Sequence, residues 1–197
     1  MAKSKEWPIK QLAPTQLTVG MIEVNDKKAA LLALNAKDQS AFMTAHPIPA
    51  ITGPQGRLYI TDHHHLARAA LEAGVETGIC VIEADLSSYD VAKFWDEMNE
   101  NLWVHPLDEH GVRHLYEALP DHLEALVDDV YRSLAGYVRD AGGYEKTPTA
   151  FAEFVWADYF RRSLAVETVK ANFRAAVQAA IPLAKSRLAK GLPGYLK

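Results

Sequence analysis

The chain has 197 residues, of which 49% are hydrophobic, and it carries 21 Lys and Arg against 25 Asp and Glu, a formal net charge of −4. This is the composition of a globular protein with enough apolar residues for a buried core. The net negative charge disfavours nonspecific binding to DNA, because the DNA phosphates attract basic surfaces.

The first half of the chain alternates between strand-like and helix-like patterns. Residues 9–12 are expected to form a short strand, and the apolar spacing of residues 25–34 predicts a helix after an Asn and Asp cap. Residues 48–52 and 57–61 are rich in strand-forming residues. The Gly53-Pro54-Gln55-Gly56 segment between them is typical of a hairpin turn, because Gly and Pro supply the backbone angles that a turn needs.

The pattern changes from strand to helix at Asp62. Apolar residues then recur at helical spacing until Gly74, a natural helix end, and residues 78–82 return as a buried strand. A strand, a helix and a strand in this order form a crossover unit. The start of its helix lies beside the end of the preceding strand, which is where ligands bind in such units.

Beyond residue 87 the sequence shows helical patterns only. We expect helices at residues 89–101, 110–118, 121–137, 149–162 and 166–180. Pro120, Gly142-Gly143 and Pro182 mark helix ends. The sequence therefore predicts an α+β protein, in which a mixed α/β domain at residues 1–86 is packed against an all-helical domain at residues 87–197.

Secreted and membrane-spanning proteins are not expected from this sequence. It shows neither the basic start and apolar run of a signal peptide nor a run of about 18 apolar residues that could span a bilayer. Cys80 is the single cysteine, so disulfides within the chain and four-cysteine zinc sites are excluded. We expect a cytoplasmic protein with no membrane partner.

The most distinctive segment is Asp62-His63-His64-His65, at the start of the helix of the crossover unit. The first turn of a helix has backbone N–H groups without partners inside the helix, and with the helix dipole they attract an anion. Imidazoles there can donate hydrogen bonds or exchange protons near neutral pH. The segment therefore predicts a site for a phosphate or a carboxylate.

Two other interpretations of this segment stay open. Asp62 can act as a plain helix cap. Three adjacent histidines also suggest a metal site, but successive side chains on a helix diverge by about 100°, so we do not expect all three to hold one ion. No metal site is therefore predicted.

The segment from Asp62 to Gly74 resembles the part of the ParB/sulfiredoxin superfamily written Asp-Gly-Glu/His-Arg/His-Arg, followed by Arg-Ala-Ala and a closing Ala-Gly. His46-Pro47-Ile48-Pro49 resembles the strand that precedes it. Further segments are similar to the ParB-like nuclease branch of this superfamily: Pro14-Thr15-Gln16, Val19-Gly20, and Asp128-Asp129 before Tyr131-Arg132-Ser133-Leu134-Ala135.

The resemblance implies a pocket that handles a nucleotide or a phosphoryl group at this helix start. Such a pocket binds CTP in ParB proteins and ATP in sulfiredoxin, and in related serine kinases it supports phosphate transfer to a hydroxyl. This chain has His65 and Leu66 where ParB has arginines, which leaves less fixed positive charge for a triphosphate. It has no cysteine where sulfiredoxin has its catalytic one, so reduction of a sulfinic acid is not expected.

The candidate catalytic residues are Glu23, His64 and His65. Glu23 resembles the catalytic glutamate of the serine kinases, and its carboxylate could act as a general base. The alternative is a solvent-facing acid near a helix cap. The two histidines would serve as the anion site and as a possible acid.

The candidate ligand-binding residues are Asp62, His63, Lys27, Arg68 and Arg132. Lys27 could neutralise phosphate charge or be solvated surface, and Arg68 lies far along its helix, so it could instead pair with an acid. Arg132 either forms a local ion pair with Asp128-Asp129 or binds a carboxylate or phosphate in fork geometry.

The function that we expect is a ParB-like enzyme that binds a nucleotide or a phosphorylated small molecule and transfers or hydrolyses a phosphoryl group. Mg²⁺ would accompany the nucleotide as its counter-ion. One alternative is a ParB-like protein that binds or cuts DNA, which the net acidity disfavours. The other is a noncatalytic ligand-binding module that has kept the pocket and lost the chemistry.

Overall fold

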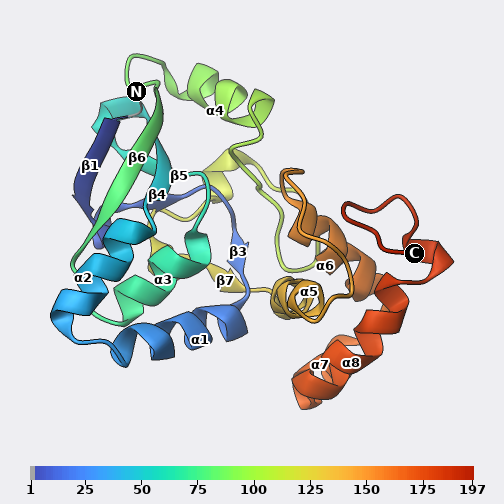
Figure 1. Cartoon of the computed structure of the whole chain (residues 1–197). Coiled ribbons are helices and arrows are strands. Elements are labelled where there is room, and N and C mark those ends of the chain that lie inside the picture. Colours follow the sequence, from blue (N-terminus) through green and yellow to red (C-terminus); the bar gives the residue numbers. More distant parts are fainter. Residues whose placement is uncertain (1–2) are drawn as a thin grey trace. The chain divides into compact units, whose positions relative to one another are not determined.

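The computed structural model describes residues 3–197. The chain divides into two compact units (Figure 1). The first unit consists of Met1–Val19 and Val24–Val127, and the second of Gly20–Glu23 and Asp128–Lys197. A five-stranded sheet in the first unit and helices in both confirm the α+β class.

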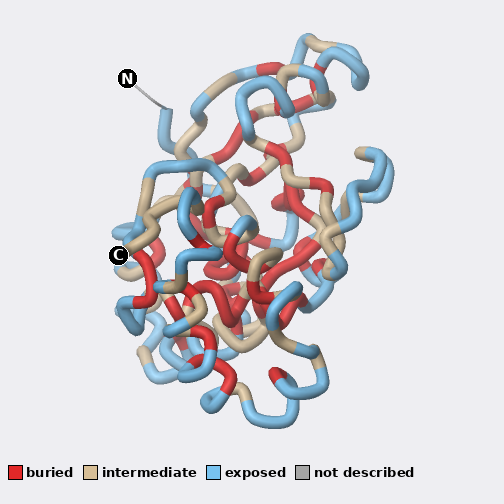
Figure 2. The backbone as a smooth tube through the Cα atoms, turned by 90° about the vertical axis from the view of Figure 1, so that its right-hand side faces the viewer, coloured by how far each residue is buried: buried red, intermediate tan, exposed pale blue. Residues whose placement is uncertain are grey.

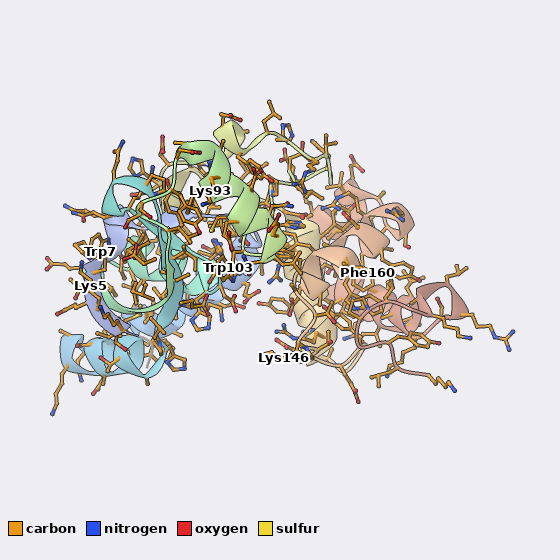
Figure 3. All side chains as sticks on the ribbon, turned by 90° about the horizontal axis from the view of Figure 1, so that it is seen from above. Lys5, Trp7, Lys93, Trp103, Lys146 and Phe160 are labelled. Carbon is orange, nitrogen blue, oxygen red and sulfur yellow. The ribbon has the colours of Figure 1, made fainter. Side chains whose placement is uncertain are left out.

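The sheet of the first unit has the strand order β1-β6-β4-β5-β2 (Figure 1). Its strands are β1 (Lys3–Pro8), β2 (Ala13–Pro14), β4 (Ile48–Thr52), β5 (Leu58–Ile60) and β6 (Thr77–Asp85). β1 is antiparallel to β6, and β4 is parallel to β6 but antiparallel to β5. On the edge strand β1, the Lys5 ammonium lies 4.1 Å from the centre of the Trp7 ring (Figure 3). A second, two-stranded sheet pairs β3 (Thr18–Val19) with β7 (Val127–Asp128).

The first unit also contains helices. They are α2 (Ala36–Ala45), α3 (His64–Glu72), α4 (Val91–Glu100) and the part of α1 (Met21–Leu32) that follows its first turn. Because side chains alternate along a strand, Leu58 and Ile60 of β5 face one side of the sheet and Tyr59 faces the other. Tyr59 packs against the apolar cluster of α4, which includes Phe94.

The boundary between the units differs from the expected one at residues 86 and 87. Residues 87–127 belong to the first unit. The reason is that Phe94 and Met98 of α4 are buried against Ile51 of the sheet and Val104 of the following loop. Apolar packing of this kind joins a helix to a sheet regardless of where the strand signals end.

The second unit is helical. It contains α5 (Val130–Asp140), α6 (Ala152–Ser163), α7 (Val166–Ala171) and α8 (Phe173–Ala184). Its apolar core, part of the buried backbone drawn in red in Figure 2, is centred on Trp156, which stacks on Tyr144 with ring centres 4.2 Å apart. Both side chains also hydrogen-bond to backbone carbonyls, Trp156 to Pro193 and Tyr144 to Ala135, so their polar atoms are satisfied.

Several predicted elements are confirmed with small shifts: β4, β5, α3, β6, α4 and α6. Other expectations were wrong. Residues 9–11 form a 3-10 helix in place of a strand, β1 and α2 were not expected, and α1 begins at Met21 instead of residue 25. The expected helix at 166–180 is split, because Asn172 has a nonhelical φ of −151° and caps α8 through the Ala175 N–H. Pro182 lies inside α8, which ends at Ala184.

Of the two helices expected at residues 110–118 and 121–137, the first is reduced to a short 3-10 helix and the second begins only at Val130, as α5. At residues 110–118, the Asp108 carboxylate accepts hydrogen bonds from the N–H groups of His110 and Val112 and holds a turn, so only Tyr116–Ala118 is helical, as a 3-10 helix. Asp side chains compete with helices in this way. At residues 121–129 only Leu123–Ala125 forms a 3-10 helix, and α5 begins at Val130.

Candidate functional site

The start of α3 lies at the carboxyl ends of two neighbouring parallel strands. β2 pairs with β5 in parallel, with Pro14 opposite Ile60. Thr15 and Thr61 are therefore the first residues beyond each strand. In open α/β sheets ligands bind at such carboxyl ends of strands. The crossover unit expected from the sequence is not formed, because β4 is antiparallel to β5 and parallel to β6, so β5 and β6 run in opposite directions.

The chain turns sharply into α3, as the sequence pattern predicts. His63, the N-cap residue, has the left-handed φ of 61°, which is uncommon for residues other than Gly. The exposed Asp62 stabilises the turn, because its Oδ1 accepts a hydrogen bond from the His63 N–H at 2.6 Å. Asp62 thus caps the turn rather than the helix itself, and the side chain of His63 makes no cap hydrogen bond.

His64 and His65 are buried, with 4% and 7% of their surface exposed. The Thr15 N–H donates to His64 Nε2 at 3.1 Å, so Nε2 carries no proton and a neutral ring holds its proton on Nδ1. The Thr15 hydroxyl donates to the Ile60 carbonyl at 2.8 Å. His64 therefore joins the end of β2 to the start of α3, a positioning role that differs from the ligand-facing one expected from the sequence.

Two buried polar atoms near this edge of the sheet have no hydrogen-bond partner among residues 3–197. They are His63 Nδ1 and Thr18 Oγ1. The neighbouring Gln16 side chain donates to the Thr18 carbonyl at 2.7 Å. Buried polar atoms in proteins are nearly always paired, so an unpaired one at a helix start marks a place where a ligand or water can bind.

Sequence reasoning assigned no role to the threonines of this edge. Besides Thr15, the Thr61 hydroxyl donates to Glu83 Oε2 at 2.9 Å. The only sequence signal was the Pro14-Thr15-Gln16 resemblance, because β2 has two residues and no recognisable strand pattern.

The contacts of Arg68 indicate a structural role and not a role in ligand binding. Its guanidinium pairs with Glu72 at 2.7 Å and donates to the carbonyls of Leu123, Glu124 and Leu126 at 2.8, 2.9 and 3.3 Å. It therefore fastens the segment before β7 to α3. The ion pair with Glu72 agrees with the alternative expectation that Arg68 pairs with an acid.

A lysine of α1, Lys28, reaches α3. Lys28 Nζ lies 3.0 Å from Glu72 Oε2. Burial acts to raise the pKa of Glu72, but the hydrogen bonds from Lys28 and Arg68 outweigh it and hold the pKa below its usual value. This three-residue cluster fixes how α1 and α3 pack.

Glu23 and Arg132 come together in the second unit. Glu23 Oε2 lies 3.8 Å from Arg132 Nη1. Gly136 gives the carboxylate room, because a Cβ at Gly136 would lie only 3.2 Å from Glu23 Oε2. Arg132 also lies over the Phe154 ring at 5.3 Å, and its buried Nε and Nη1 atoms make no hydrogen bond within the described chain.

The two aspartates before α5 do not pair with Arg132 through their side chains. Asp128 Oδ1 accepts from the Met21 N–H at 2.9 Å. Asp129 caps α5 by accepting from the Tyr131 N–H at 2.9 Å, and its other oxygen binds Arg161 at 2.7 Å. The local ion pair expected for Arg132 is thus replaced by the Glu23 contact.

Residues 3–197 contain no group of three or more His, Cys, Asp or Glu side chains arranged to hold a metal ion. In the same residues no helix combines the length and apolar character that crossing a membrane requires.

Comparison with known proteins identifies relatives of the chain. A family model described as "Putative ParB-like nuclease" matches residues 5–162. The crystal structure of protein Atu1540 from Agrobacterium tumefaciens has 36% sequence identity and a TM-score of 0.91, over 98% of each chain. The C-terminally truncated chromosome-partitioning protein ParB from Caulobacter crescentus, complexed with CTP-gamma-S, has 15% identity and a TM-score of 0.33, over 92% of this chain and 98% of that chain.

The comparison with curated proteins found no match. The family model nevertheless covers most of the chain, and it includes the β2–β5 edge, α3 and the Glu23–Arg132 pair. The resemblance seen in the sequence is therefore confirmed, and the chain belongs to the ParB-like nuclease family.

Proposed function

We propose that this chain binds a nucleotide or a phosphorylated small molecule at the start of α3, and that it transfers or hydrolyses a phosphoryl group. The observation that carries the proposal is the turn at Asp62 and His63. There α3 begins without a side-chain cap at the carboxyl edge of two parallel strands, beside a buried imidazole nitrogen that has no partner in the described chain. A phosphate would accept a hydrogen bond from that imidazole and is favoured by the helix dipole.

In this proposal Asp62 and His63 contact the ligand, because they are the least buried residues of the turn. The buried His64 and His65 side chains hold the start of α3 in place from inside the protein. Glu23 is proposed as a general base, and within the second unit Arg132 orients its carboxylate. Lys27 supplies positive charge toward the phosphate.

Mg²⁺ is the counter-ion proposed for a nucleotide ligand. Mg²⁺ is usually held by one or two carboxylates together with phosphate oxygens and water, and not by a dedicated cage of protein ligands. The exposed carboxylate of Asp62 fits this requirement. When bound, the ion would neutralise phosphate charge.

A thermal-shift panel tests ligand binding. Ribonucleoside triphosphates are added with and without Mg²⁺, and a ligand at 100 times its Kd should stabilise the folded protein by about 2.7 kcal/mol, a rise of several degrees in Tm. Replacing His63 with Asn keeps the left-handed backbone accessible and removes the imidazole. We expect His63→Asn to reduce the shift and the surface variant His122→Asn to preserve it. No shift with any nucleotide would contradict the proposal.

The Glu23→Gln variant separates the enzyme from a noncatalytic binding module. If the ligand turns over, Glu23→Gln should slow turnover by at least about 100-fold while ligand binding persists. Binding without turnover in both proteins would favour the noncatalytic module.

A second candidate function is DNA binding, and a charge imbalance favours it. The first unit carries ten Lys and Arg against seventeen Asp and Glu, whereas the second carries eleven against eight. From Arg162 to Lys197 there are seven basic side chains, all exposed, and one acidic side chain, Glu167. The overall charge of −4 therefore combines an acidic first unit with a basic second unit, and the exposed basic residues of the second unit favour DNA binding.

Salt-dependent retention of duplex DNA tests this alternative. Each phosphate contact contributes about −0.9 to the slope of log K against log salt. The triple variant Lys185→Gln, Arg187→Gln and Lys190→Gln should weaken binding and flatten that slope, whereas changing three exposed lysines of the first unit should not. Equal effects of the two sets, or no retention at low salt, would argue against it.

A further inference from the structure

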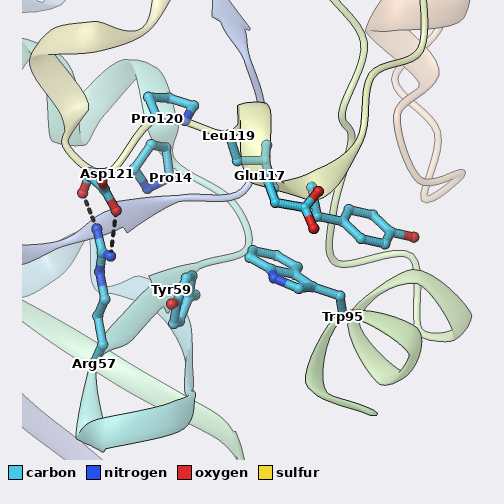
Figure 4. Close-up of a pocket in the computed structure, with 9 residues that line it drawn as sticks. Pro14, Arg57, Tyr59, Trp95, Glu117, Leu119, Pro120 and Asp121 are labelled. Carbon is cyan, nitrogen blue, oxygen red and sulfur yellow. Dashed lines mark hydrogen bonds and ion pairs between the residues drawn. The ribbon is translucent and has the colours of Figure 1, made fainter. Parts of the chain in front are cut away.

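The first unit contains a pocket of about 180 Å³ on the side of the sheet that carries α4 (Figure 4). Its walls come from four places: Pro14 of β2, Arg57 and Tyr59 at β5, Trp95 on α4, and the segment from Tyr116 to Asp121. The volume is below the roughly 300–1,000 Å³ of pockets for drug-sized ligands, so the pocket suits a group of a few heavy atoms. Pro14 also belongs to the β2–β5 edge described above, but none of the candidate catalytic or ligand-binding residues lines the pocket.

Three aromatic rings form the pocket wall and are held in place by one another. Trp95 stacks on Tyr116 with ring centres 5.3 Å apart, and the Tyr59 ring meets Trp95 edge-on at 5.5 Å. Tyr59 is fixed from behind by Phe94 at 4.7 Å and by Gly53, where a Cβ would approach the Tyr59 ring to 2.5 Å. The rings are therefore arranged before any ligand arrives.

Of the three charged side chains that line the pocket, two form an ion pair with each other and one carboxylate has no charged partner in the described part of the chain. Arg57 is engaged by Asp121, whose Oδ1 lies 2.7 Å from Arg57 Nη1 and whose carbonyl accepts a further hydrogen bond (Figure 4). Glu117 is exposed and forms no ion pair or hydrogen bond within residues 3–197. The lining thus combines three aromatic rings with a net charge of one negative unit.

This combination decides the class of ligand. A phosphate or carboxylate would be repelled by Glu117 and would have to break the Arg57–Asp121 pair. Aromatic faces attract cations, and Trp does so most strongly. We propose that the pocket binds an organic ammonium group, held against the Trp95 ring and paired with the Glu117 carboxylate, because the Arg57 guanidinium already lies over the Tyr59 ring at 5.4 Å. This is a second site, independent of the phosphate site proposed at α3.

Choline and its neutral carbon isostere 3,3-dimethylbutan-1-ol test the proposal, because the two molecules share a shape and differ in charge. Binding is measured by titration calorimetry and by the indole N–H signal of Trp95 in NMR spectra of the full chain. We expect choline to bind at least roughly tenfold more tightly than the alcohol, and added salt to weaken it. Equal affinities, or no binding of choline at 100-fold excess over protein, would overturn the proposal.

Variants locate the site. Glu117→Gln should weaken choline binding several-fold and leave the alcohol unaffected, whereas the surface variant Glu124→Gln should change neither. Trp95→Leu should abolish binding, and Trp95→Phe, which keeps an aromatic ring, should retain part of it. Unchanged binding in Glu117→Gln and in Trp95→Phe, both with wild-type Tm, would place choline elsewhere and refute the assignment.

Discussion

The buried carboxylate of Asp129 gives the sharpest test of how the second unit is held together. Asp129 is 2% exposed, caps α5 through the Tyr131 N–H, and pairs with Arg161 at 2.7 Å. Asp129→Ala removes both contacts. Loss of a helix cap costs about 1 kcal/mol, and a charge-assisted hydrogen bond contributes about 1.5–3 kcal/mol. Because Arg161 keeps its ion pair with Asp158, we expect a total loss of about 2–4 kcal/mol.

Asp129→Asn separates the cap from the charge. The Asn side chain can still accept from the Tyr131 N–H but carries no charge for Arg161, so the expected loss at pH 7 is about 1 kcal/mol smaller than for Asp129→Ala. Urea unfolding followed by circular dichroism measures both variants, since the second unit is helical. Equal losses in Asp129→Asn and Asp129→Ala would show that the hydrogen bond from the Tyr131 N–H contributes nothing to stability.

The pH dependence of the stability of Asp129→Asn, compared with the wild type, tests how burial and Arg161 act on the Asp129 carboxyl. Burial is the largest influence on Asp129 and raises the pKa of its carboxyl above the ordinary 3.8, although the Arg161 charge opposes it. With a raised pKa, the folded protein takes up a proton before the unfolded chain does. The wild type should therefore gain stability relative to Asp129→Asn as the pH falls toward 3.8. A relative loss over this range would show that Arg161 outweighs burial.

Three more predictions follow from packing and burial. Gly20→Ala would place a Cβ 2.4 Å from Ser133 Oγ and 2.6 Å from its backbone nitrogen, so urea unfolding should show a loss of about 1–3 kcal/mol. Burial raises the pKa of the Cys80 thiol to about 11, so iodoacetamide at pH 8 should label Cys80 only after unfolding. Arg68→Ala should speed hydrogen exchange at residues 123–127, which would be unchanged if Arg68 were dispensable there.

Much of the first unit could be predicted because its signals are local. The hairpin between β4 and β5, the turn at Asp62 and the end of α3 before Gly74 depend on residues a few positions apart. The segment at residues 101–128 was predicted less well. Its conformation depends on the Asp108 carboxylate and on Arg68, which lies 55 residues before the Leu123 carbonyl that it holds.

The sequence by itself determined the α+β class, the family and the polar turn that begins α3, because periodicity, turn residues and motifs are properties of neighbouring positions. Only the tertiary structure decided which partners those residues have. His64 binds Thr15 across 49 residues, Asp129 binds Arg161 across 32, and the aromatic pocket joins β2, β5, α4 and a later loop. Local spacing reaches about one helical turn, so contacts at such separations are fixed by how the whole core packs.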